Sequence, residues 1–235
     1  MKWFLDVGHS RLCKHRQLAG GDVFLSRKER EEDRTIVVLS DGLGSGIKAN
    51  VLATLTATMA GKFIASYRDI RHTAGIIMAT LPVCKVRKVS YATFSLADIQ
   101  PCGTTRLMEY DNPGVLVVRG DRIIRPARER VEVQGSYTYK KNPLLVSTVR
   151  AELGDRIILC SDGVTQSGMG TRSHPLGWGE ENLERFVLDT VGAAPEISAR
   201  ELATRITGRA LANDLGEARD DTTCGVIHFR RPRRL

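Results

Sequence analysis

The chain has 235 residues, of which 42% are hydrophobic and 26% charged, and its formal net charge is +8. This composition is typical of a soluble globular protein with a substantial core, and no apolar run approaches the roughly 20 residues that a membrane span needs. The N-terminal segment reaches an acid at Asp6, too early for a secretory signal. We therefore expect a cytoplasmic protein with no membrane partner.

The positive charge raises nucleic-acid binding through the basic tail as a further alternative, and the cysteines bear on disulfide and zinc sites. Basic residues gather at residues 11–16, 85–88, 122–130 and 230–234. Aromatic residues make up only 6% of the chain and do not interleave with these clusters as a stacking platform for nucleic acid requires. The five cysteines include no CxxC pair, which argues against a disulfide framework and a zinc site. We expect a solvated basic surface that helps to recruit an acidic or phosphorylated protein, and no nucleic-acid partner.

Apolar patterns and turn residues predict the following elements in chain order. They are strands at 22–26 and 35–40, helices at 47–67 and 70–80, strands at 90–96, 105–110, 115–118, 123–124 and 156–160, helices at 181–191 and 198–212, and a strand at 223–229. A charged hairpin at 27–34 joins the first two strands, Leu81 and Pro82 stop the second helix, and an Asn-Pro-Gly turn at 112–114 joins the strands at 105–110 and 115–118.

The order of these elements predicts the fold class. Strands outnumber helices, and two helix pairs flank a β-rich middle, which favours an α+β layered domain over a regular βαβ alternation. No repeat or linker divides the chain, so we expect one catalytic domain over residues 1–235, with a core at about 20–229 and a basic tail at 230–235.

Four aspartates lie in glycine- or threonine-rich turns, each beside an apolar run. They are Asp22 after Gly20-Gly21, Asp41 in Ser40-Asp41-Gly42, Asp162 in Ser161-Asp162-Gly163, and Asp220 in Asp220-Asp221-Thr222-Thr223. One such turn alone is ordinary turn chemistry. Four together indicate carboxylates gathered at one edge of a sheet, where like charges crowd unless a cation neutralises them. Hard oxygen ligands of this kind suit Mg or Mn.

The glycine-rich segment at residues 40–46 matches other phosphate motifs poorly. It lacks the Gly-Lys-Ser/Thr of a P-loop and the final glycine spacing of a dinucleotide-binding fingerprint. Asp41 would also repel a pyrophosphate. A haloacid-dehalogenase-type aspartyl nucleophile would need a second aspartate at position 43, where the chain has Leu43.

The ordered combination of GGD, SDGxGSG, CSDGV and DDTT resembles the metal-dependent protein phosphatases of the protein phosphatase 2C (PP2C) superfamily. It is most similar to the bacterial branch typified by the stage II sporulation protein E (SpoIIE) serine phosphatases, and the resemblance spans residues 20–229. It implies a four-layer αββα sandwich, in which helix pairs flank two central antiparallel β-sheets.

The resemblance also implies a centre of two divalent cations, Mn or Mg. Its ligands would be the carboxylates of Asp22, Asp41, Asp162 and Asp220 and the backbone carbonyl of Gly42, with Asp221 in a supporting role. No catalytic residue separate from these ligands is implied.

Two positions depart from the patterns of relatives. Leu43 stands where the eukaryotic branch has a histidine that is a candidate general acid, and Val115 stands where the bacterial branch has the histidine of an Asn-Ala-Gly-His turn. Asn112 and Gly114 are all that match that turn. The sequence therefore identifies no proton donor for the leaving oxygen.

The function implied is that of a metal-dependent protein serine/threonine phosphatase in bacterial signalling. It would hydrolyse phosphoserine or phosphothreonine on a regulatory protein, such as an anti-anti-sigma-like protein, with a water activated by the two metals. Control would come from a homodimer or a regulatory partner. The alternative is a catalytically weak phosphatase-like module that binds a phosphorylated regulator.

Overall fold

A computed structural model describes residues 3–44, 46–66, 69–80, 92–131 and 143–232. The chain divides into two compact units, each with its own sheet and core: unit 1 comprises residues 1–18, 113–125 and 151–235, and unit 2 comprises residues 19–112 and 126–150. The predicted helix stop at residues 81–82, the basic cluster at 85–88 and the start of the strand at 90 lie outside the described residues.

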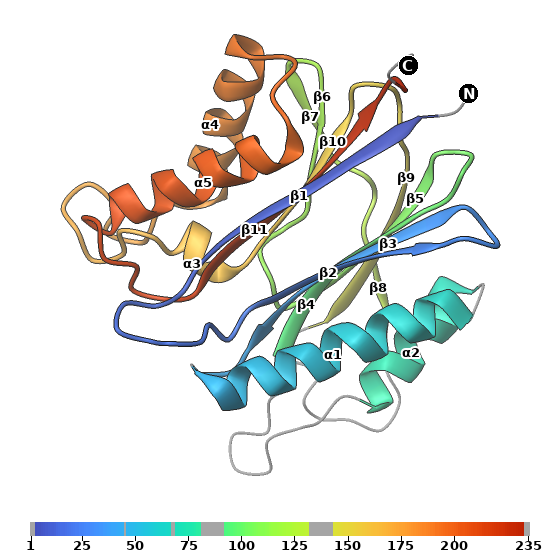
Figure 1. The fold of residues 1–235 in the computed structure, drawn as a ribbon, viewed down its shortest axis with the longest axis horizontal. Coiled ribbons are helices and arrows are strands. Elements are labelled where there is room, and N and C mark those ends of the chain that lie inside the picture. The colour runs from blue at the N-terminus through green and yellow to red at the C-terminus, as the bar shows by residue number, and fades with distance from the viewer. Residues whose placement is uncertain (1–2, 45, 67–68, 81–91, 132–142, 233–235) are drawn as a thin grey trace. The chain divides into compact units, whose positions relative to one another are not determined.

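Unit 2 is built on a six-stranded antiparallel sheet with the strand order β2-β3-β4-β5-β9-β8. Its strands are β2 (Val23–Glu29), β3 (Arg34–Gly42), β4 (Ala92–Ile99), β5 (Thr104–Tyr110), β8 (Glu129–Val131) and β9 (Leu144–Arg150). Two helices, α1 (Ile47–Ser66) and α2 (Ile70–Thr80), lie against this sheet (Figure 1).

Helix α1 lies close to the sheet because small side chains form its buried face. Ala53, Ala57 and Ala60 are fully buried, and Gly61 brings the helix backbone near Leu25 and Val38. The core behind this face contains larger side chains from β3, β4, β5 and α2, among them Ile36, Val38, Phe94, Leu96, Met108, Tyr110, Ile77 and Met78. Burial of this apolar surface supplies most of the stability of the unit.

A buried cluster of charges ties three strands of unit 2 together. The carboxylate of Asp98 on β4 is fully buried and accepts hydrogen bonds from Arg34 on β3 and Arg106 on β5. Arg34 also donates to the carbonyl oxygen of Ile64 at 2.6 Å, in the last turn of α1. The guanidinium therefore satisfies a carbonyl that the helix end leaves without an intrahelical donor.

Unit 1 is built on a five-stranded antiparallel sheet with the strand order β1-β11-β10-β6-β7. Its strands are β1 (Phe4–Leu12), β6 (Leu116–Arg119), β7 (Arg122–Ile124), β10 (Arg156–Cys160) and β11 (Thr222–Arg230), and its helices are α3 (Asp162–Thr165), α4 (Glu180–Ala193) and α5 (Ala199–Asn213). Helix α5 runs along β1 and β11 (Figure 1). A Cβ at Gly8 on β1 would lie 2.3 Å from the backbone nitrogen of Arg200, so only glycine permits this approach.

The predicted α+β class, with two antiparallel sheets that each carry helices, is confirmed. The helix at 70–80 and the strand at 156–160 have the predicted bounds, and the other predicted elements are found with shifted ends. Strands β1, β8 and β9 and the short helix α3 were not predicted. The segment predicted as a turn at 112–114 connects β5 to β6, and these two strands belong to different sheets, since β5 pairs with β9 and β6 pairs with β10.

None of the helices in the described ranges combines the length and apolarity that a bilayer crossing requires.

A buried histidine lies in the middle strand of the β1-β11-β10 ladder. His228 is 4% exposed and stands directly opposite Asp6 on β1 and Arg156 on β10. Burial lowers the pKa of His228 from its ordinary value of 6.5 to about 4, and the positive charges of Arg156 and Arg230 act in the same direction against the weaker opposite effect of Asp6 and Glu196. The imidazole is therefore neutral at physiological pH.

This depressed pKa predicts a loss of stability in mild acid. Between pH 6.5 and pH 4 the unfolded chain binds a proton on His228 that the folded chain does not, so the free energy of unfolding falls as the pH falls through this window. The shift corresponds to about 2–3 kcal/mol lost between pH 7 and pH 4.5. Urea unfolding at pH 7 and at pH 4.5 measures this loss. The decrease in the free energy of unfolding between the two pH values should be about 2–3 kcal/mol smaller in His228→Gln than in the unsubstituted protein. Equal decreases in the two proteins would contradict the assignment.

Candidate functional site

The predicted metal-ligating residues of unit 2 lie at one end of its sheet. In the β2-β3 ladder Val23 stands opposite Ser40, and continuing the register by one step places Asp22 opposite Asp41. Asp22 is fully buried, and Asp41 is half-buried near the end of β3. Two neighbouring carboxylates, one removed from water, form an arrangement that a cation stabilises.

Gly42 lies where α1 approaches the end of β3. A Cβ at this position would lie 2.2 Å from the carbonyl oxygen of Ala49 in the first turns of α1. The space that the side chain of any other residue needs is therefore filled by helix backbone. The close approach fixes the strand end, and with it the Gly42 carbonyl that the sequence predicts as a metal ligand.

The predicted ligands of unit 1 lie at the adjoining ends of β10 and β11. The strands pair up to Cys160 opposite Cys224, and Ser161 extends the ladder by donating its N–H to the Thr223 carbonyl at 3.0 Å and accepting the Thr223 N–H on its hydroxyl oxygen at 2.9 Å. A Cβ at Gly163 would lie 2.1 Å from the carbonyl oxygen of Asp221. The turn that carries Asp162 is thus in backbone contact with the turn that carries the other two aspartates.

Hydrogen bonds hold the three aspartates of unit 1 in different ways. Asp162 begins α3 and accepts a hydrogen bond from Nε2 of Gln166 at 3.0 Å. Asp221 is 3% exposed and its carboxylate accepts the backbone N–H of Lys14 at 2.9 Å, while its own N–H donates to the Asp220 carboxylate at 2.9 Å. Asp221 therefore anchors the segment after β1, and Asp220 is half-exposed beside it.

Lys14 and Gln166 were not predicted as parts of this site. Gln166 could not be found from the sequence, because its contact with Asp162 depends on the short helix α3, which was not predicted. Neither could Lys14, because its contact with Asp221 joins residues 207 positions apart.

Leu43 and Val115 offer no proton donor. Leu43 is 38% exposed, and Val115 is buried in unit 1. Asn112 is held by Thr93, which donates to its side-chain oxygen, and it donates to the Ser95 hydroxyl at 3.2 Å. It therefore contributes to the order of unit 2 without contributing a proton.

We expect Gly163→Ala to destabilise the protein. The added methyl group would overlap the Asp221 carbonyl, and relief of this overlap would cost about 1–3 kcal/mol. Gly208→Ala, in α5, is the matched control: it meets no atom within 4 Å and should stabilise the helix by about 0.5–1 kcal/mol. Urea unfolding of both variants measures the difference. A neutral Gly163→Ala would show that the two turns are not packed as described.

The donor atoms in both units fit a hard divalent cation. All are carboxylate or carbonyl oxygens, the ligand type that Mg and Mn prefer. In the described part of the chain no group of three or more histidine, cysteine, aspartate or glutamate side chains is arranged to hold a metal ion. The predicted ligands are divided between the two units, and a complete metal centre stays a prediction.

Solved structures resemble the chain over almost its whole length. The phosphatase domain of the cell fate determinant SpoIIE from Bacillus subtilis superimposes with a TM-score of 0.72 at 16% identity, over 99% of this chain and 95% of that one. The RsbU and RsbW domains of a Mycobacterium tuberculosis protein give 0.71 at 20% identity, over 99% of this chain and 62% of that one. RsbX in complex with magnesium gives 0.63 at 15% identity, over 96% and 95% of the two chains. Identities this low show a shared fold.

No curated protein sequence matches the chain. The family model of stage II sporulation protein E, however, matches residues 31–230, which is most of the chain and includes Asp41, Gly42, Asp162 and Asp220. With the PP2C fold of the solved relatives, this match assigns the chain to the stage II sporulation protein E family of PP2C-type phosphatase domains.

Proposed function

We propose that the chain is a Mg- or Mn-dependent protein phosphatase that hydrolyses phosphoserine or phosphothreonine on a regulatory protein. The observation that carries this proposal is the family match over residues 31–230, because it includes four predicted ligand positions at the ends of strands β3, β10 and β11. The magnesium in the RsbX structure supports a hard divalent cation.

The proposed centre of two cations would be held by the carboxylates of Asp22, Asp41, Asp162 and Asp220 and by the backbone carbonyl of Gly42. Bound there, the cations would lower the pKa of a water molecule and offset the negative charge of the phosphoryl group.

The residues around these ligands would hold them in place. Asp221 fixes Asp220 through its backbone N–H and fixes the segment after β1 through Lys14. Gln166 orients one oxygen of Asp162. Neither Leu43 nor Val115 can donate a proton to the leaving oxygen, and we assign this role to no residue.

The partner proposed is a phosphorylated regulatory protein of the anti-anti-sigma type. The net charge of +8 favours an acidic or phosphorylated protein. One solved relative carries RsbU and RsbW domains in one chain, and another belongs to the bacterial stressosome, which supports a regulatory partner. A second copy of this chain or a separate regulator would control activity.

Release of phosphate from a phosphoserine peptide tests the proposal. Turnover should need Mg or Mn, stop with EDTA, return when the metal is restored, and be weak with a phosphotyrosine peptide. Calorimetric titration with Mg or Mn provides a readout independent of activity.

Two outcomes would decide against the proposal. Turnover that persists in EDTA would exclude the metal-dependent reaction. Binding of the phosphoserine peptide without turnover under any metal would favour the alternative function, a phosphatase-like module that binds a phosphorylated regulator.

A further inference from the structure

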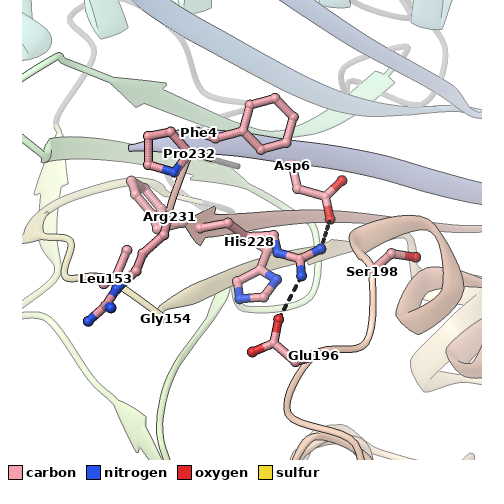
Figure 2. A pocket seen from close by; sticks show the side chains of 11 residues that line it. Phe4, Asp6, Leu153, Gly154, Glu196, Ser198, His228, Arg231 and Pro232 are labelled. Carbon is pink, nitrogen blue, oxygen red and sulfur yellow. Dashed lines mark hydrogen bonds and ion pairs between the residues drawn. The ribbon is translucent and has the colours of Figure 1, made fainter. Parts of the chain in front are cut away.

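Unit 1 has a cavity of about 840 Å³ at the end of its sheet that is far from the aspartate turns. It is lined by residues from the start of β1, the turn before β10, the segment before α5 and the end of β11: Phe4, Asp6, Leu153, Gly154, Glu196, Ser198, His228, Phe229, Arg230, Arg231 and Pro232 (Figure 2). Six residues of β11 (222–227) lie between Asp221 and His228, the first residue of this strand that lines the cavity, a span of roughly 23 Å. The cavity is therefore distinct from the predicted metal ligands, and its volume lies within the range of small-molecule sites.

The lining carries two carboxylates and two guanidinium groups, so its formal charges cancel, but the ion pairs are distributed unevenly. Arg230 lies 2.7 Å from the Glu196 carboxylate and 3.6 Å from the Asp6 carboxylate, so both lining acids pair with this residue (Figure 2). Asp6 also accepts a hydrogen bond at 3.0 Å from the backbone N–H of Ala199, the first residue of α5. Arg231 has no hydrogen-bond or ion-pair partner among the described residues.

His228 adds a buried polar group without a partner. Its side chain lines the cavity, and its Nδ1 atom has no hydrogen-bond partner in the described part of the chain. Buried imidazole nitrogens normally form a hydrogen bond, and an exception points to a missing partner. Arg156 and Arg230 face the ring, and they make its surroundings favourable for a negative charge.

Apolar groups form the remaining wall. Phe4 is 55% exposed and Leu153 is 36% exposed, and Pro232 lines the cavity beside Arg231. Large apolar side chains that stay exposed around a concave surface are typical of a ligand site. The cavity thus combines an apolar wall with an unpaired guanidinium and a buried imidazole.

We propose that this cavity binds a small organic anion, a molecule that carries a carboxylate or a phosphate monoester on an apolar or aromatic body. The anion would pair with Arg231, and the body would cover Phe4, Leu153 and Pro232. The negative charge would also offset the effect of Arg156 and Arg230 on His228, so that bound ligand raises the pKa of the imidazole while Asp6 and Glu196 stay paired with Arg230.

Nuclear magnetic resonance of metal-free protein with ¹⁵N-labelled histidine rings tests this proposal. The probes are phenylacetate and phenyl phosphate, compared with acetate, inorganic phosphate and the neutral 2-phenylacetamide. We expect saturable shifts of the His228 ring resonances, assigned with His228→Gln, and a raised pKa with the aromatic anions. A stronger response to phenylacetate identifies a carboxylate ligand, and a stronger response to phenyl phosphate a phosphate ester.

Arg231→Gln should weaken binding of the preferred probe by about tenfold or more, because it removes the charge that pairs with the anion. Arg185→Gln makes the same substitution at an exposed position on α4, outside the cavity, and should leave binding unchanged. Absence of saturable shifts, an equal response to 2-phenylacetamide, or binding that Arg231→Gln leaves intact would each overturn the proposal.

Discussion

Asp41→Asn and Asp162→Asn are each expected to lower metal-dependent phosphate release by a factor on the order of a hundred or more. Each removes one negative charge from a predicted cation ligand, and charge stabilisation of this kind usually contributes a factor of that size. Asparagine keeps the size of the side chain, so β3 and α3 should form as before. Phosphate release from the phosphoserine peptide measures the effect, and calorimetry measures the loss of metal affinity.

The two variants also test whether Asp41 and Asp162 act together in one reaction. Residues that act as a unit are strongly non-additive, so the double variant should be about as inactive as either single variant. Two controls carry the same substitution outside the predicted ligands, and both should leave turnover unchanged. Asp33→Asn lies in a turn of unit 2, where asparagine tolerates the positive φ of 48°. Asp121→Asn lies in an exposed turn of unit 1. Turnover and metal affinity that survive in Asp41→Asn or Asp162→Asn would exclude that residue as a ligand.

Local sequence patterns predicted the elements that local interactions specify. The helix at 70–80 combines an apolar stripe with a following proline, and the strand at 156–160 is an unbroken apolar run, so both have the predicted bounds. β1 was missed because its sequence FLDVGHSRL contains Asp6, Gly8 and Ser10, which are poor strand formers. It becomes a strand through a nine-residue pairing with β11, at the other end of the chain.

β9 is a different kind of omission. Its sequence LLVSTVR is rich in β-branched residues, so a signal for a strand was present. The residues of the predicted turn at 112–114 specify a change of direction, but they do not specify which strands pair on either side of it. Asn112 is held by Thr93 and Ser95 of unit 2, whereas the N–H of Gly114 donates to Glu180 of unit 1 at 2.8 Å.

The candidate site was predictable as a set of residues and not as a geometry. The aspartates were found because each stands beside a strand in a turn of glycine or threonine. The close backbone contacts of Gly42 with Ala49 and of Gly163 with Asp221 depend on packing between segments that the sequence separates, so no local pattern indicates them. The ligand roles of Asp22, Asp41, Asp162 and Asp220 stay predictions.

The buried charge cluster of unit 2 could not be read from the sequence either, since Arg34, Asp98 and Arg106 look like ordinary surface residues. In the structure Asp98 is fully buried, and the side chains of Arg34 and Arg106 are only 5% and 11% exposed. The single carboxylate accepts hydrogen bonds from both guanidinium groups. Its removal therefore takes from both buried guanidinium groups the carboxylate that they share, while Arg34 keeps its hydrogen bond to the Ile64 carbonyl.

Asp98→Ala is expected to destabilise the protein by about 3–5 kcal/mol, because Arg34 and Arg106 would keep the cost of burial and lose its compensation. Urea unfolding measures the loss. Glu129→Ala is the matched control in the same unit. It breaks an ion pair between two exposed side chains, Glu129 at 57% and Arg71 at 68% exposure, and should cost no more than about 1 kcal/mol. Asp98→Asn should lie between the two, since it keeps an acceptor oxygen and loses the charge. If Asp98→Ala cost as little as Glu129→Ala, water would have to reach both arginines, and the cluster would not be buried as described.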